Sequence, residues 1–156
     1  MKRSKIGLLC LMIGLATLCN SCSEEDLVSH VPTFSDMAFN PTAPHVGQTI
    51  TATCVQSHKG SLLDRTTYAW SYTVNGQTTD VNSATTNYGV DNSDPFIRFT
   101  PTEAGNYSIT VTIRYNLSAK TDGTSGSYTI PDGTVSYQNG TLVSLVTITK
   151  KFNVLE

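Results

Sequence analysis

The chain has little of what a helical fold needs. Charged residues make up 14% of the sequence, and beyond residue 21 Leu, Ala, Lys and Glu are scarce while Thr, Ser, Val, Tyr and Asn are abundant. No window shows apolar residues at the i, i+3, i+4 and i+7 spacing of an amphipathic helix. Thr, Val and Tyr favour strands, whereas the scarce residues are the helix formers. The composition therefore predicts an all-β fold.

The sequence also lacks the patterns of common active sites. Its three histidines, His30, His45 and His58, fall in predicted loop or tether segments. No G-x-S-x-G, H-E-x-x-H or paired-carboxylate pattern accompanies them. We therefore expect a protein that is not an enzyme, in which these histidines are solvated loop residues.

No apolar run is long enough to cross a membrane, but the chain opens with a shorter one. Met1 to Lys5 carries three basic residues and no acid, and Ile6 to Leu18 is uncharged. Thirteen residues rise only about 20 Å as a helix, against a hydrocarbon core of about 30 Å. A basic start, a short apolar stretch and small residues before a cut are typical of an export signal. We expect residues 1–21 to be a signal peptide that is removed.

The cut is expected before Cys22. Ser21-Cys22 resembles a bacterial lipobox, in which a small residue precedes a cysteine that becomes lipidated and N-terminal; here Cys19 stands where that motif usually has Leu. The resemblance implies lipidation of Cys22 and a membrane anchor. Two alternatives are cleavage at Cys19, which would place bulky Leu18 against the cut, and ordinary signal cleavage that leaves Cys22 a thiol.

An acidic run follows the anchor. Ser23, Glu24, Glu25 and Asp26 resemble the export signal of Bacteroidetes-type surface lipoproteins, which implies a location on the outer face of the outer membrane. The simpler interpretation is a solvated tether over residues 22–31. Removal of residues 1–21 takes three of the ten basic residues and none of the twelve acidic ones, which leaves a net charge of −5. That charge argues against nucleic acid as a partner.

The remaining residues 32–156 suit one domain of about seven strands. An extended segment over 32–40 and a strand from Val46 to Val55 are expected first, then strands around Trp70 and over 96–100. A weak edge strand is expected within 77–94. From Tyr107 to Leu117 every second residue is apolar, as in a strand with one buried face. The last strand, about 142–154, keeps this phase except at Lys150, which predicts a bulge or an edge that faces water.

A hairpin insertion is predicted between the last two strands, within about 119–140. Pro131-Asp132-Gly133 is a turn sequence flanked by short strand-like segments. We expect the hairpin to project from one end of the domain and to offer Tyr128 and Tyr137 to a glycan or a protein. The alternative is that the two tyrosines cover each other across the hairpin.

Four residues indicate a particular type of β-sandwich fold. Cys54, Trp70 and Ile109 fall where an immunoglobulin-like domain places its first cysteine, its tryptophan and its second cysteine, and Tyr107 resembles the tyrosine corner. With Ile109 in the partner position and Cys22 acylated, Cys54 has no disulfide partner and is expected to be a buried apolar residue. The run Ala104-Gly105-Asn106-Tyr107 through Ile113 also resembles PKD-like (polycystic kidney disease) domains. The chain departs from that family after Trp70, where the usual acidic residues are missing.

One loop has the residues of a cation site. Asp91-Asn92-Ser93-Asp94 clusters oxygen ligands of the kind calcium takes, with Asp91 and Asp94 the candidate ligands. A turn built from Asx residues explains the same sequence without an ion, and no other cofactor is indicated.

Two functions fit these features. The first is a surface lipoprotein that acts as a binding or adhesion module toward a glycan or a protein. The second is an accessory subunit of an outer-membrane complex, such as a polysaccharide-uptake system.

Overall fold

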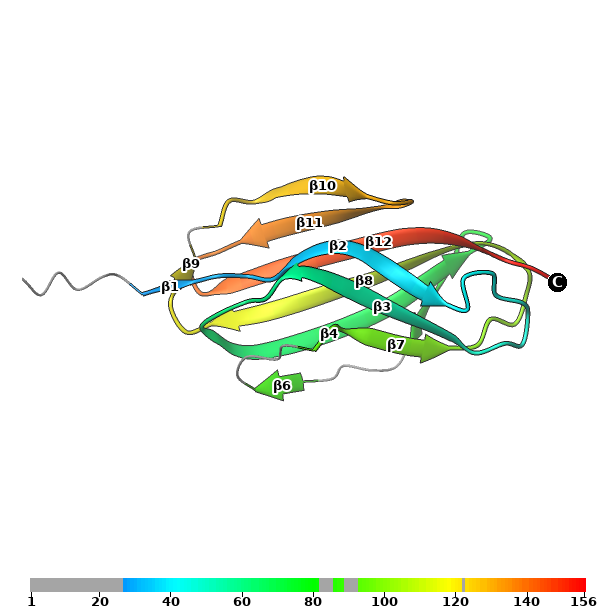
Figure 1. The fold of residues 1–156 in the computed structure, drawn as a ribbon, viewed down its shortest axis with the longest axis horizontal. Helices are drawn as coiled ribbons and strands as arrows, with labels where there is room; N and C mark the ends of the chain where they lie inside the picture. The colour runs from blue at the N-terminus through cyan, green and yellow to red at the C-terminus, as the bar shows by residue number, and fades with distance from the viewer. Residues whose placement is uncertain (1–26, 82–85, 89–92, 122) are drawn as a thin grey trace, which may run out of the picture.

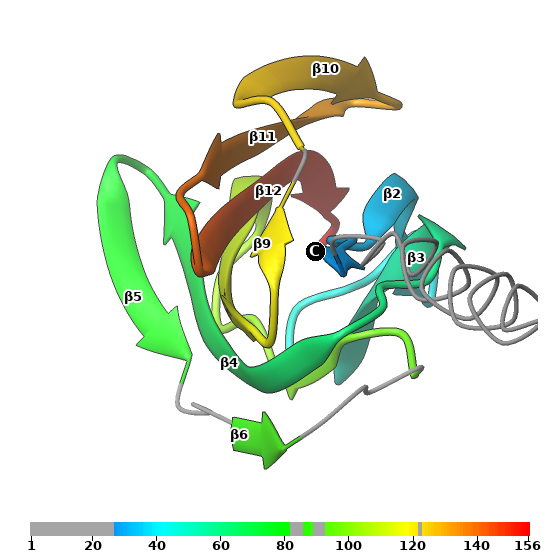
Figure 2. The same ribbon diagram turned by 90° about the vertical axis from the view of Figure 1, so that its left-hand side faces the viewer.

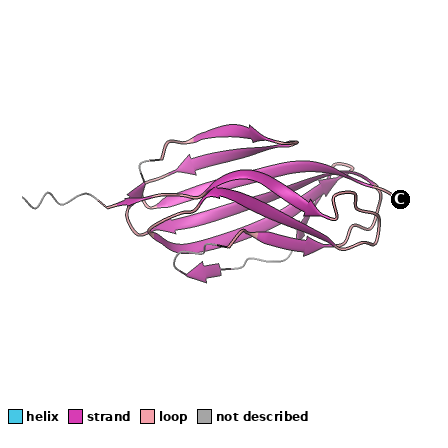
Figure 3. Ribbon diagram, viewed as in Figure 1, coloured by secondary structure: helices cyan, strands magenta, loops and turns pink. Residues whose placement is uncertain are grey.

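The computed structural model describes residues 27–81, 86–88, 93–121 and 123–156. Within these ranges every regular element is a strand, and there is no helix (Figure 3). The strands are β1 (Val28–Ser29), β2 (Thr33–Asn40), β3 (Ile50–His58), β4 (Leu63–Val74), β5 (Gln77–Val81), β6 (Thr86–Tyr88), β7 (Phe96–Phe99), β8 (Gly105–Leu117), β9 (Lys120–Thr121), β10 (Gly126–Ile130), β11 (Gly133–Asn139) and β12 (Val143–Val154). The predicted all-β fold is confirmed.

Two antiparallel sheets face each other across the core (Figures 1 and 2). The large sheet has the order β10-β11-β12-β8-β4-β5, and β6 also pairs with β4. The small sheet has the order β2-β3-β7. A third, minor pair joins β1 to β9 in parallel at the end of the molecule opposite the C-terminus (Figure 1).

Strand β8 buries its side chains as the alternation predicted. From Tyr107 to Leu117 every second residue is buried, and the intervening ones are half-buried or exposed. The strand lies between β4 and β12, so both of its edges are paired along its length. A strand in that position needs one apolar face for the core, and a period of two supplies it.

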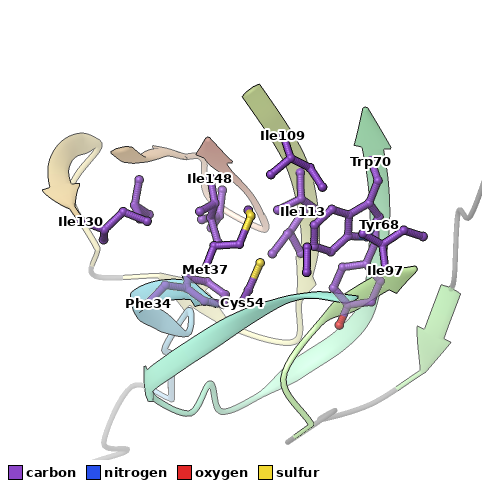
Figure 4. Close-up of a cluster of buried hydrophobic side chains, with 14 of the residues drawn as sticks. Phe34, Met37, Cys54, Tyr68, Trp70, Ile97, Ile109, Ile113, Ile130 and Ile148 are labelled. Atoms are coloured by element: carbon purple, nitrogen blue, oxygen red, sulfur yellow. The ribbon is translucent and has the colours of Figure 1, made fainter. Parts of the chain in front are cut away.

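The residues that indicated a sandwich lie in one apolar cluster. Cys54 and Ile109 are fully buried and Trp70 is 4% exposed (Figure 4). Burial, with a smaller contribution from Asp94, raises the pKa of the Cys54 thiol, which is a free thiol. Cys54 thus packs as a small apolar side chain.

The predicted tyrosine corner is present. The Tyr107 hydroxyl donates a hydrogen bond of 2.9 Å to the carbonyl of Glu103, four residues earlier. The turn between them includes Gly105, whose φ of 143° is a region that L side chains rarely adopt. This bond fixes the start of β8 against the preceding turn.

Two predicted boundaries are wrong. The strand expected from Val46 begins at Ile50, because the chain still turns at Gly47, where φ is 77°. The segment expected to be a tether is ordered from Val28, because the buried Ser29 hydroxyl donates to Leu62 O (2.9 Å) and accepts from Ala119 N (3.0 Å). Residues 22–26 of that tether lie outside the described residues.

The prediction of a bulge or a water-facing edge at Lys150 is also wrong. Strand β12 pairs without a register shift with β8 on one side and β11 on the other. Lys150 points inward with 9% of its surface exposed, and its ammonium lies 2.6 Å from Asp36 Oδ1 on β2. The opposite carboxylate on the other sheet is what allows a lysine at an inward position.

Candidate functional site

The two hairpin tyrosines lie together but join the hairpin to β2. Their rings stack with centroids 6.0 Å apart, and the Tyr128 hydroxyl accepts from Phe34 N (3.0 Å) and donates to Phe34 O (2.7 Å). The Tyr137 hydroxyl donates to Pro32 O (3.1 Å). Burial and the hydrogen bond with Tyr128 raise the pKa of Tyr137. Both hydroxyl protons are therefore used within the fold, although 39% of Tyr128 is exposed.

The predicted hairpin exists, but the expectation that it projects from one end is wrong. Strand β11 pairs with β12 over seven residues and thereby extends the large sheet beyond β12 (Figure 2). Gly133 permits this close pairing, because a Cβ there would collide with the carbonyl oxygen of Thr149. The turn needs its left-handed residue at Asp132, where φ is 54°. The hairpin covers the side of the molecule where β2 and β12 would otherwise be open.

The predicted calcium ligands are only partly within the described residues. Asp91 lies outside them. Asp94 accepts hydrogen bonds from Gln56 N (3.2 Å) and from the Lys59 ammonium (3.3 Å). The lysine thus places a positive charge beside this carboxylate without a metal ion. Among residues 27–81, 93–121 and 123–156, no three His, Cys, Asp or Glu side chains gather as metal ligands would. The calcium site stays a prediction.

Cys22, the expected lipidation site, lies outside the described residues. The first described residue, Leu27, leads directly into β1, so the anchor would attach at the β1–β9 end (Figure 1). In the part of the chain that the structure describes, no helix is long and apolar enough to cross a membrane.

Two of the histidines, His30 and His58, lie on neighbouring segments, and His45 is near the C-terminus. His30 bridges to Ser61, the ring of His58 lies 3.0 Å from the Thr33 hydroxyl, and His45 bridges to Leu155 near the C-terminus. Each is part of local loop or strand-end structure.

The sequence did not predict a groove on the large sheet, at the end of the molecule where the C-terminus lies. The groove has a volume of about 880 Å³ and crosses the outward face of the sheet between the β4–β5 turn and the β10–β11 turn. It is lined by Thr73, Asn75, Gly76, Asn106, Tyr107, Ser108, Asp132, Gly133, Thr134, Thr149, Lys151, Phe152 and Asn153. Ten of these thirteen residues have a hydroxyl, amide, carboxylate or ammonium side chain, so hydrogen-bond donors and acceptors line the groove beside apolar surface.

The strand register explains why the hydroxyls gather on this face. Residues directly opposite in an antiparallel pair share a face, and Thr134, Thr149, Thr110 and Ser71 follow one another across β11, β12, β8 and β4. Thr110 and Thr149 are joined by a hydrogen bond of 3.0 Å. The alternating Ser and Thr of each strand are visible in the sequence. Which strands are neighbours is not, and the groove depends on that.

A smaller cavity of about 470 Å³ lies between β2 and β12. Its lining includes the Asp36–Lys150 ion pair and the rings of Phe39 and Phe152, whose centroids are 4.4 Å apart. The Lys150 ammonium is also 5.7 Å from the centre of the Phe39 ring, within the range of a cation–π contact. Asp36 and Lys150 are thus engaged with each other, and the larger groove is the better candidate for a ligand.

Comparisons with known proteins gave no match, whether the chain was compared with family models, with curated proteins or with solved structures.

Proposed function

We propose that the protein is a non-catalytic, lipid-anchored binding module of the bacterial cell surface, and that the groove on the large sheet binds a glycan. The observation that carries the proposal is the position and lining of that groove. The groove is lined by many hydrogen-bonding side chains and lies at the end of the molecule opposite β1, where the anchor would attach. A ligand site at the free end of an anchored domain is open to the surroundings.

The chemistry of the groove favours a neutral, polyhydroxylated ligand. Amide and hydroxyl side chains of Asn106, Asn153, Thr134 and Ser108 both donate and accept hydrogen bonds, which matches the hydroxyls of sugars. Lys151 and Asp132 supply one charge of each sign, so no strongly charged ligand is favoured. The groove also replaces the tyrosine pair as the proposed contact surface, because Tyr128 already bonds to Phe34 of β2 and Tyr137 to Pro32 just before it.

An immunoglobulin-like arrangement, with the resemblance to PKD-like domains, is part of the proposal. The small sheet β2-β3-β7 and the part β12-β8-β4-β5 of the large sheet together have seven strands in an order that such sandwiches use. The tyrosine corner at Tyr107 and the buried set of Cys54, Trp70 and Ile109 support it. The β10–β11 hairpin is then an insertion before the last strand.

Mass spectrometry of the mature protein tests the lipid anchor. We expect mature protein from bacterial membranes to begin at Cys22 and to carry a diacyl or triacyl modification there. Cys22→Ala should release the protein from the membrane fraction. Protease added to whole cells should remove the domain if it faces the exterior. An unmodified N-terminus would contradict the anchor, and protection from protease would place the domain in the periplasm.

A double variant at a pair of asparagines on neighbouring strands tests glycan binding. Asn106 and Asn153 are directly opposite each other on β8 and β12, and both are exposed in the groove. Asn106→Ala with Asn153→Ala should weaken binding on a glycan array at least tenfold without lowering Tm. The matched control is Thr51→Ala with Arg98→Ala, an opposite pair on the small sheet. No glycan signal from the wild-type protein, or equal loss in both double variants, would contradict the proposal.

One observation favours the second function, an accessory subunit. Phe96 on β7 is 56% exposed, with the Arg98 guanidinium 5.6 Å from its ring centre. Aromatic and arginine side chains carry much of the binding energy at protein interfaces. Co-purification of an outer-membrane partner that is lost in Phe96→Ala, together with an empty glycan array, would favour this function over the first.

A further inference from the structure

Exposed leucines gather at the end of the molecule formed by β1 and β9. Among the described residues four leucines have at least 36% of their surface exposed, and three of them are at this end: Leu27 (73%), Leu62 (36%) and Leu142 (53%). The fourth, Leu155 (41%), is near the C-terminus at the opposite end (Figure 1).

Hydrogen bonds between neighbouring loops bring the three leucines to one surface. The carbonyl of Leu62 accepts from the Ser29 hydroxyl (2.9 Å) and from Ser118 N (2.8 Å). The carbonyl of Leu142 accepts from Leu117 N (2.9 Å), one residue before Ser118. Leu27 directly precedes β1, which also contains Ser29. The three residues thus lie on adjoining segments that are fixed to one another.

The backbone at Leu62 does not call for leucine. Its φ is 53°, in the left-handed region where Gly and Asn are favoured and a bulky side chain is uncommon. Its carbonyl makes both hydrogen bonds through backbone atoms that any residue has. A leucine at this position therefore adds an exposed apolar side chain at a conformational cost, which points to a use for that side chain.

The proposed anchor fixes what this surface faces. Cys22 is five residues before Leu27, and a fully extended chain of that length spans at most about 18 Å. With Cys22 acylated, the β1–β9 end is the part of the domain nearest the bilayer. The opposite end, with the groove, lies farther away by roughly the length of β8, thirteen residues or about 40 Å.

We propose that the β1–β9 end is a lipid-contact surface, in which Leu27, Leu62 and Leu142 insert into the membrane interface. This contact holds the domain upright with its groove directed away from the bilayer. The proposal rests on the lipid anchor of the proposed function. It adds a fixed orientation, which a tether alone does not give.

The test measures the distance of each end from the lipid surface. The acylated full-length mature protein is placed in phosphatidylcholine vesicles that contain a lipid with a nitroxide headgroup, and a fluorophore is attached through Lys120→Cys on β9 or Gln77→Cys on β5. Both positions are exposed and lie at opposite ends. Cys54 is buried and its thiol pKa is raised, so it does not take the label. Quenching should be at least threefold stronger at position 120 than at 77.

A leucine variant shows whether the side chains cause this orientation. Leu27→Ser, Leu62→Asn and Leu142→Ser together should reduce quenching at position 120 to near the value at 77, whereas Leu155→Ser should leave it unchanged. Tm of each variant checks the fold. Equal quenching at both ends, or no change in the triple variant, would overturn the orientation alone. Absence of an acyl mass on Cys22 would overturn the anchor and the orientation that depends on it.

Discussion

Strands β8 and β12 are neighbours that pair over twelve residues, yet they fill the core differently. Every inward residue of β8 from Tyr107 to Leu117 is apolar or aromatic, and its surroundings are other strands of the large sheet and the core. Strand β12 places Lys150 at an inward position directly opposite Ile109, which is fully buried. The same sheet therefore tolerates a cation in one strand beside an isoleucine in the next.

The difference follows from what lies across the core at each point. Lys150 is close to the side of the sandwich where β2 passes, and Asp36 and the Phe39 ring meet its ammonium at 2.6 and 5.7 Å. Strand β8 is central, between β4 and β12. A buried charge is acceptable only with a partner, and the partner is available only at the margin of the sandwich.

The largest effect should come from the centre of β8. Ile113→Ala removes a fully buried side chain that pairs with Val146 and Tyr68, and the cavity should lower the free energy of unfolding by about 2–5 kcal/mol. Urea unfolding of wild type and variant measures this. A loss below about 1 kcal/mol would mean that the core near β8 closes around the gap, and that the two strands differ less than their packing indicates.

The ion pair of β12 should show a smaller effect that depends on which partner is removed. Asp36→Ala leaves the buried Lys150 without its carboxylate and should cost about 1–3 kcal/mol, below the usual 3–5 because a third of the Asp36 side chain is exposed. Adding Lys150→Met to Asp36→Ala should recover most of that loss. If Asp36→Ala alone leaves urea stability unchanged, the ion pair does not stabilise the link between β2 and β12.

The contrast between these strands also explains how much the sequence could predict. In β8 the period of two, the buried face and the corner bond of Tyr107 all follow from local spacing. At Lys150 the same rule failed, because Asp36 is 114 residues away in the chain and only the packing of β2 against β12 brings the two together.

The candidate site shows the same limit. The sequence predicts Tyr128 and Tyr137 as a pair across a hairpin, but their bonds to Phe34 and Pro32 depend on where the hairpin lies in space. The groove was not predicted, because its lining comes from the β4–β5 turn, the β10–β11 turn and two strands between them. Local spacing predicts strands and turns, whereas sites made by several strands require the order of those strands in the sheet.

Loss of the hydrogen bonds between Tyr128 and β2 should lower the free energy of unfolding less than either of the preceding changes. Tyr128→Phe keeps the ring but leaves Phe34 N and Phe34 O without this partner, at a cost of about 1–2 kcal/mol. Tyr107→Phe, which leaves only Glu103 O, is the matched comparison and should cost about 1 kcal/mol. Urea unfolding measures both. A Tyr128→Phe variant as stable as wild type would mean that the hairpin is held by its pairing with β12 alone.

The smallest effect is expected at alkaline pH from Tyr137. Its pKa is raised in the folded protein, first by burial and then by the hydrogen bond with Tyr128, above the ordinary value of 10. Below pH 10 the phenol is neutral in both the folded and the unfolded chain, so its contribution to stability is fully present. As pH rises above 10, the unfolded chain loses this proton first, which lowers the free energy of unfolding.

Tyr137→Phe should therefore reduce the fall in the free energy of unfolding between pH 10 and 12. The variant also loses the hydrogen bond to Pro32 O, and this loss is the same at every pH. Urea midpoints measured at pH 8, 10 and 11.5 give the two slopes. The Phe variant removes the titrating group from the side of the sandwich where the hairpin meets β2. Parallel slopes for wild type and variant would mean that Tyr137 titrates alike in the folded and unfolded chains, and that the hairpin does not exclude water from it.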